Sequence, residues 1–245
     1  MSAKYVYCIL NCQDMIAPDK TGFEERELYN ISYKDISALV SDISTVDYSN
    51  DNILIHETVN ESMMRYYTVL PMRFGTVMSG DAKVRSMLEL WYDDFTENFS
   101  RLEGQVEMGV KIIWPVDKIK QDTDFGVNIQ EQDIDGLPAG VGYLRRRLRE
   151  HLIEEALKKK ANQLSRDVDR LLRPCFADSR VKTMATEKMV LNGSYMVFKD
   201  QVEAFRRKSR EIILRCPETK ILLSGPWPPY NFTRLRQNKT EEGVK

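Results

Sequence analysis

Near its C-terminus the chain contains the stretch Gly225-Pro226-Trp227-Pro228-Pro229-Tyr230-Asn231-Phe232, directly after the apolar run 221–224, which is typical of a buried strand. The three prolines in this stretch remove three backbone donors and hold φ at about −65°, so neither a helix nor an inner strand can pass through it. What remains is a stiff, extended segment that displays Trp227, Tyr230 and Phe232. Two interpretations follow. The segment is either a rigid aromatic clamp that closes its domain, or a preformed surface that loses little entropy when a partner protein docks.

The second half of the chain, upstream of this stretch, predicts the element order α–ββ–α–β. A long helix is expected from about Tyr143 to Arg173, because apolar residues recur there at helical spacing until Pro174 stops it. At 1.5 Å per residue this helix would be roughly 45 Å long, more than a small domain needs. The other expected elements are strands at 180–185, 194–198 and 220–224, a helix at 200–215, and an Asn192-Gly193 turn between the first two strands.

The first half predicts the order β–ββ–α–β–α–β. Alternating and helical apolar patterns indicate strands at 4–12, 28–33, 36–43, 72–78 and 106–114, with helices at 53–70 and 81–103 and an exposed loop at 17–27. Strands interleaved with helices in this way favour an α+β fold: a ferredoxin-like N-terminal domain with one sheet covered by two helices. The second half resembles the same plan without its first strand, so a second α+β domain with a long helix is expected.

The composition changes between Asp117 and Gly142, where acidic, amide and glycine residues replace the large apolar ones. Such a stretch marks a domain boundary. We therefore expect an N-terminal domain at 1–116, a linker at 117–142, a C-terminal domain at 143–236 and a flexible tail at 237–245.

The overall composition is that of a soluble globular protein, with 42% hydrophobic and 30% charged residues. Lys plus Arg (36) and Asp plus Glu (37) nearly cancel, so no long-range attraction to nucleic acid or anionic lipid is expected. No run approaches the roughly 20 apolar residues that span a bilayer, and the N-terminus lacks the pattern of a signal peptide. The sequence thus predicts a cytoplasmic protein that engages neither membrane nor nucleic acid.

The sequence does not place reactive side chains at the spacings that metal or catalytic sites need. None of the four cysteines is paired at Cys-x-x-Cys spacing, and His56 and His151 lie far apart, so no metal site and no cofactor are predicted. His56 lies beside Glu57 and precedes Arg73, but a histidine on a helix surface without an orienting partner is more often inert. The glycine-rich run 136–142 lacks the Lys-Ser/Thr of a phosphate cradle. No catalytic residue is predicted.

Four motifs together resemble the gas vesicle F/L family (GvpF/GvpL) across nearly the whole chain. They are Tyr67-Thr68-Val69-Leu70-Pro71-Met72-Arg73-Phe74-Gly75-Thr76, Glu107-Met108-Gly109-Val110-Lys111-Ile112 with Trp114, Gly142-Tyr143-Leu144, and Ser224 to Phe232. The F and L members resemble each other too closely for these motifs to separate them. The resemblance implies a non-enzymatic accessory or assembly protein, located at the gas vesicle, that contacts the small hydrophobic shell protein and other gas vesicle accessory proteins.

A shell subunit that polymerises through apolar strand edges would aggregate if it were released uncovered into the cytosol. A partner with aromatic, proline-held surfaces could cover it before assembly. The candidate contact residues are Arg73, Phe74, Trp227, Pro228, Pro229 and Tyr230. Two alternatives stay open: these motifs only hold the two domains together, or the protein is a ferredoxin-like regulatory module that binds a small ligand.

Overall fold

The structure is a computed structural model that describes residues 2–13, 20–45, 49–116, 137–184, 186, 188–215 and 219–236. Its chain divides into two compact units. Unit 1 comprises Met1–Glu107 together with Gly225–Lys245, and unit 2 comprises Met108–Ser224. The chain therefore leaves unit 1 within strand β6 (Gln105–Ile113) and returns to it within strand β9 (Lys220–Trp227). Residues 225–236, which the sequence analysis grouped with the second domain, cluster with the first unit.

Unit 1 is built on an antiparallel sheet with the strand order β2-β3-β1-β4, in which β5 also pairs with β1. The strands are β1 (Ala3–Leu10), β2 (Tyr29–Tyr33), β3 (Ile36–Ile43), β4 (Val69–Pro71) and β5 (Val77–Met78). The order and directions of β1 to β4 are those of a ferredoxin-like sheet. Between β1 and β2, however, the described residues form only the short 3-10 helix η1 (Phe23–Glu25) where that fold has a full helix.

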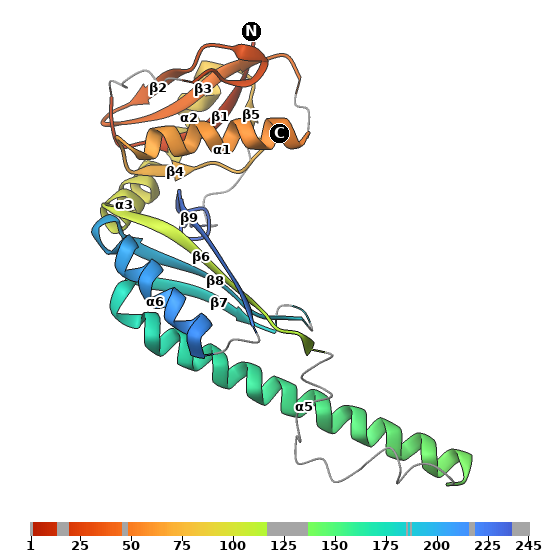
Figure 1. Ribbon diagram of the computed structural model, residues 1–245. Coiled ribbons are helices and arrows are strands. Elements are labelled where there is room, and N and C mark those ends of the chain that lie inside the picture. Colours follow the sequence, from red (N-terminus) through yellow and green to blue (C-terminus); the bar gives the residue numbers. More distant parts are fainter. Residues whose placement is uncertain are drawn as a thin grey trace. The chain divides into compact units, whose positions relative to one another are not determined.

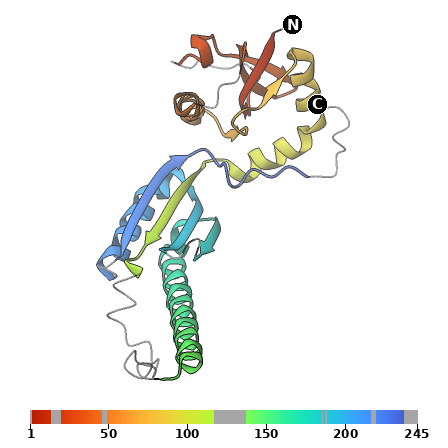
Figure 2. The same ribbon diagram turned by 90° about the vertical axis from the view of Figure 1, so that its right-hand side faces the viewer.

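The helices of unit 1 cover both faces of this sheet. They are α1 (Asn50–Met64), α2 (Asp81–Leu90) and α3 (Tyr92–Leu102). Val59 and Met63 of α1 share a core with Tyr5, whereas the neighbouring Lys4 points to the other face and lies 3.2 Å from Asp81 of α2. Figure 2 shows α1 end-on at one side of the strands and α2 at the other. The predicted α+β class with a helix-covered sheet is confirmed, although a ferredoxin-like sheet carries both helices on one face.

Three predicted elements of unit 1 have different limits. The helix predicted at 53–70 begins at Asn50, where Ser49 accepts the Asn52 N–H, and ends at Met64 because residues 69–71 pair with β1 instead. The strand predicted at 72–78 is confirmed only at Val77–Met78, which form β5, since residues 72–76 leave the sheet between β4 and β5. The helix predicted at 81–103 is interrupted at Trp91, whose φ of −104° and ψ of 12° separate α2 from α3.

Unit 2 packs two helices on one face of a second sheet, with the strand order β7-β8-β6-β9 (Figure 1). The remaining elements are β7 (Asp178–Thr183), β8 (Met189–Phe198), α5 (Ala139–Leu172), η3 (Arg173–Cys175), η4 (Lys199–Gln201) and α6 (Val202–Arg215). The core joins Leu157 and Val168 of α5 and Phe205 of α6 to Val110 of β6 and Tyr195 of β8. β9 lies at the edge of the sheet, where a strand tolerates a proline such as Pro226.

The Asn192-Gly193 turn predicted in unit 2 is wrong, because both residues lie inside β8. A Cβ atom at Gly193 would lie 2.7 Å from the ring of Tyr195, which projects from the same face two residues later. Glycine is present here to make room for a buried ring and not to form a turn.

We predict that Gly193→Ala lowers the free energy of unfolding by about 1–3 kcal/mol, because the Tyr195 ring must shift in a packed core. Gly140→Ala is the matched control. It lies in α5 with no atom within 4 Å of the added Cβ, and should stabilise by about 0.5–1 kcal/mol through helix propensity. Urea denaturation of both variants measures the two effects. Equal stabilities would contradict the assigned role of Gly193.

Candidate functional site

The candidate contact residues Arg73 and Phe74 lie in a tight turn that leaves the sheet of unit 1. The Met72 N–H donates to the Tyr7 carbonyl (2.9 Å) on entry, and the Val6 N–H donates to the Thr76 carbonyl (2.9 Å) on exit. Inside the turn, the Thr76 N–H donates to the Arg73 carbonyl over 3.1 Å, and Gly75 has a φ of +86°. A glycine in this left-handed conformation at the third turn position is typical of a type II turn. We call residues 72–76 the Arg73 turn.

A buried hydrogen-bond chain holds the Arg73 turn from beneath. The Gly75 N–H donates to the Tyr5 hydroxyl (3.0 Å), and this hydroxyl lies 3.0 Å from Nδ1 of His56. Nε2 of His56 lies 3.2 Å from the Met72 carbonyl oxygen. Because a carbonyl only accepts, Nε2 carries the proton and Nδ1 accepts from the Tyr5 hydroxyl. His56 and Tyr5 thus fix the two sides of the turn that presents Arg73 and Phe74.

His56 is a positioning residue. Its side chain is 2% exposed, and burial lowers its pKa from the ordinary 6.5 to about 4, so the ring is neutral at pH 7. The ring stacks on Tyr7 and makes edge contacts with Tyr5 and Phe74. The expectation that His56 lies on a helix surface without an orienting partner is wrong, because both ring nitrogens have hydrogen-bond partners.

These rings belong to a larger group, which we call the aromatic cluster. Its members are Tyr5, Tyr7, Phe23, His56, Phe74 and Tyr230. The cluster joins residues from three distant parts of the chain, since the centroid of Tyr230 lies 6.5 Å from that of His56. Aromatic pairs at such distances add about 0.5–1.5 kcal/mol each beyond the area they bury.

The C-terminal residues 228–236, which we call the strap, are fixed to unit 1 by their own contacts. The Tyr230 hydroxyl accepts from Nδ2 of Asn60 in α1 (3.1 Å). Asn231 donates its backbone N–H and its side-chain amide to the buried carboxylate of Glu107, over 2.9 and 2.5 Å. Phe232 follows with 0% of its surface exposed. A carboxylate that receives two donors in this way is a strong anchor.

Helix α3 holds the other end of the strap. Asn98 pairs with the backbone of Arg234, since its Nδ2 donates to the carbonyl (2.6 Å) and its Oδ1 accepts the N–H (3.0 Å). Arg101 donates to the Phe232 carbonyl. The buried carboxylate of Asp94 accepts the Arg236 N–H over 3.1 Å. These contacts support the interpretation of the C-terminal stretch as a clamp on unit 1.

The six candidate contact residues therefore differ in burial. Pro228 and Pro229 are buried, Phe74 and Trp227 are half-buried, and Tyr230 keeps 39% of its surface exposed. The guanidinium of Arg73 is exposed and forms no ion pair with any residue that the structure describes.

The structure brings Phe74 and Tyr230 together through His56, with Arg73 adjacent to Phe74 in the chain. His56, Tyr5 and Asn60 were not among the residues predicted from the sequence to form the site. The spacing of His56 and Asn60, one turn apart on the face of α1 that includes buried Val59 and Met63, was the signal that placed them inward.

Comparison with known proteins shows the family of this chain. The family model described as "Gas vesicle synthesis protein GvpL/GvpF" matches residues 3–234. The chain belongs to this family. Gas vesicle protein F1 of Halobacterium salinarum is 24% identical over 236 residues, which cover 94% of this chain and 92% of that protein. Gas vesicle protein L of a Streptomyces species is 27% identical over 218 residues, or 85% and 78% of the two chains.

Solved structures agree with the GvpL/GvpF fold. The crystal structure of GvpF from Anabaena superposes with a TM-score of 0.84, at 20% identity, over 96% of this chain and 100% of that one. GvpF from Microcystis aeruginosa gives a TM-score of 0.75 at 18% identity, with the same coverage. Membership in this family assigns the chain a role in gas vesicle formation. Within the described residues, no helix is both long and apolar enough to cross a bilayer.

Proposed function

We propose that this chain is a non-enzymatic accessory protein that binds the small hydrophobic shell protein during gas vesicle formation. The proposed contact surface consists of the exposed Arg73 and Tyr230 and the half-buried Phe74 and Trp227, with the buried Pro228 and Pro229 as contact-supporting residues. The observation that carries the proposal is the Arg73 turn. A buried His56–Tyr5 chain fixes its backbone on both sides, while its arginine is exposed to solvent and forms no ion pair with the part of the chain that the structure describes.

A surface held in this way suits binding to an apolar, aggregation-prone partner. Binding costs less when the contacting groups are ordered beforehand, and the turn loses little freedom on docking because both of its sides are already fixed. Arginine, tyrosine and tryptophan are also the residue types that carry most binding energy in protein interfaces. The proposal needs no reactive side chain, since His56 uses both ring nitrogens to hold the turn. Other gas vesicle accessory proteins are further proposed partners, and the gas vesicle is the proposed location.

Co-purification of the shell protein with tagged variants tests this surface. We expect Arg73→Glu and Tyr230→Ala each to weaken retention of the shell protein by roughly tenfold or more, the effect of losing one interface hot spot. Arg85→Glu and Tyr66→Ala are the matched controls, because Arg85 is exposed on α2 and Tyr66 is 57% exposed just beyond α1. Each variant must remain folded at the temperature of the assay, which circular dichroism checks. Full retention by both folded site variants would remove this surface from the proposed function.

A thermal-shift comparison separates this proposal from a small-ligand module. Any partner that binds only the folded protein raises its melting temperature. We expect stabilisation by the shell protein and none by a panel of metabolites. Stabilisation by a metabolite alone would favour the regulatory module.

A further inference from the structure

Unit 1 holds the strap largely through side chains that contact the strap's backbone. Asn98 donates to the Arg234 carbonyl and accepts the Arg234 N–H, and Arg101 donates to the Phe232 carbonyl. Two carboxylates each accept a further backbone N–H of the strap. Contacts of this kind recognise an extended segment, since they use groups that the main chain itself carries. We call the side chains that make them the strap site: Asp94, Asn98, Arg101 and Glu107.

The strap site favours an occupied state. Release of the strap would take the hydrogen-bond partners of Asp94, Asn98 and Glu107 away, and these side chains are only 3%, 2% and 5% exposed while the strap is in place. It would also uncover the apolar surface that encloses the Phe232 ring, which is 0% exposed. A segment with the same donors, acceptors and ring would therefore be bound whenever the chain's own strap is displaced.

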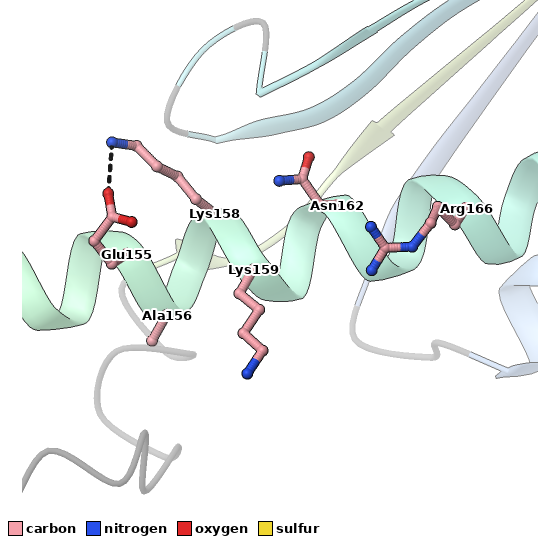
Figure 3. Close-up of a pocket in the computed structure, with 6 residues that line it drawn as sticks. All are labelled: Glu155, Ala156, Lys158, Lys159, Asn162 and Arg166. Carbon is pink, nitrogen blue, oxygen red and sulfur yellow. Dashed lines mark hydrogen bonds and ion pairs between the residues drawn. The ribbon is translucent and has the colours of Figure 1, made fainter.

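The depression on helix α5 that Figure 3 shows is not a comparable site. It measures about 530 Å³, and its described lining comes from α5 alone. Lys158 already pairs there with Glu155 at 3.2 Å. The polar lining residues within the described chain are all exposed, so the depression lacks the buried, converging groups that hold the strap.

The strap can leave its site without breaking either sheet. It follows β9, the last strand that the structure describes, and residues 233–236 belong to no helix or strand. The Phe232 N–H donates to the Pro229 carbonyl over 3.1 Å, so this turn moves with the strap. Gly225, where the chain re-enters unit 1, has a φ of +100°, a conformation that favours glycine. It is the natural hinge, because the prolines that follow are stiff.

We propose that the strap site is a peptide-binding site that also accepts the strap of a second copy of this chain, so that two copies exchange straps. The second copy carries the same segment, and every contact of the strap site can form between copies as it forms within one. A tethered strap has an effective concentration of about a millimolar, so exchange needs a comparable protein concentration or a mismatched strap. The proposal goes beyond the proposed function and does not rest on it, because no shell protein takes part.

A labelled synthetic peptide that spans residues 225–236 tests the site in the full chain. Asn231→Asp is the receptor variant, because its new carboxylate faces Glu107 and repels the chain's own strap with little change of shape. We expect the peptide to bind this variant at least tenfold more tightly than the wild type, whose tethered strap competes. A peptide that carries Phe232→Ala lacks the buried ring and should bind at least tenfold more weakly.

Mixing two full-length variants tests exchange between copies. The strap of Asn231→Asp is mismatched with its own site but fits that of Glu107→Gln, whose amide can donate to the new carboxylate. Analytical ultracentrifugation at about 500 µM, near the effective concentration of a tethered strap, should show monomers of each variant alone and dimers in the mixture. Asn192→Asp, the same change at an exposed position of β8, should stay monomeric when mixed with Glu107→Gln.

The results separate the site from the exchange. Equal binding of the peptide by the wild type and Asn231→Asp would place it outside the strap site, and no binding by the folded variant would remove the site. Peptide binding with a monomeric mixture would overturn exchange. If circular dichroism shows that Asn231→Asp is unfolded alone, Asn231→Ala replaces it in the peptide assay, with binding at least roughly threefold tighter than the wild type expected. The helix signal of Asn231→Asp should then return on mixing with Glu107→Gln, and its failure to return would overturn exchange.

Discussion

Replacing Phe232 with alanine is expected to lower the free energy of unfolding of this GvpL/GvpF protein by about 3–5 kcal/mol, the usual cost of truncating a buried phenylalanine. The ring is 0% exposed, and the backbone on both sides of it is held by Glu107, Arg101 and Asn98. A cavity at this position cannot collapse easily, because these hydrogen bonds keep the strap in place.

Denaturant unfolding that follows the signal of unit 1 measures this effect. Leu235→Ala is the matched control, since Leu235 lies in the same strap but is 40% exposed, and it should cost less than about 0.5 kcal/mol. If the two variants unfold at the same denaturant concentration, the strap does not hold unit 1 together. Because Tyr230 is two residues from Phe232, we also expect Phe232→Ala to weaken shell-protein retention along with stability.

The elements of this fold were predictable where one local pattern dominates. The strand at 36–43 has the limits that its apolar run predicts, since one pleated segment buries nearly all of its side chains. The predictions failed where a distant partner overrides the local pattern. Residues 65–70 fit the helical spacing, but pairing of residues 69–71 with β1 ends α1 at Met64. Gly193 matches turn chemistry, but the Tyr195 ring explains it.

The candidate site was predictable only in its parts. The motifs that contain Phe74 and Tyr230 stand out in the sequence as rigid and aromatic, but they are separated by more than half of the chain. What joins them is the return of the chain from unit 2 to unit 1 through β9, and no local pattern encodes that return. His56 was missed for a related reason: its partners, Tyr5 and Met72, come from separate strands or turns that meet only in the folded sheet.

Lowering the pH from 7 to 4 is expected to remove about 3 kcal/mol of stability through His56 alone. Its pKa is about 4 in the folded protein and near the ordinary 6.5 when unfolded, so the unfolded state binds more protons in this window, and the full contribution is present only above about 6.5.

Comparison of variants isolates this contribution. Other groups also lose stability in acid, such as Asp42, whose pKa is lowered by its hydrogen bond with Lys4. His56→Gln stays neutral throughout and should flatten the dependence of unfolding free energy on pH by about 3 kcal/mol between pH 7 and 4. His151→Gln, at an exposed position of α5, should follow the wild type. The same protonation ends the donation of the Tyr5 hydroxyl to Nδ1 and places a buried charge beneath the Arg73 turn, so the turn should loosen before unit 1 unfolds. Shell-protein retention that falls below pH 5 in the wild type, but not in His56→Gln, would link the buried ring to the binding surface; identical pH profiles would separate them.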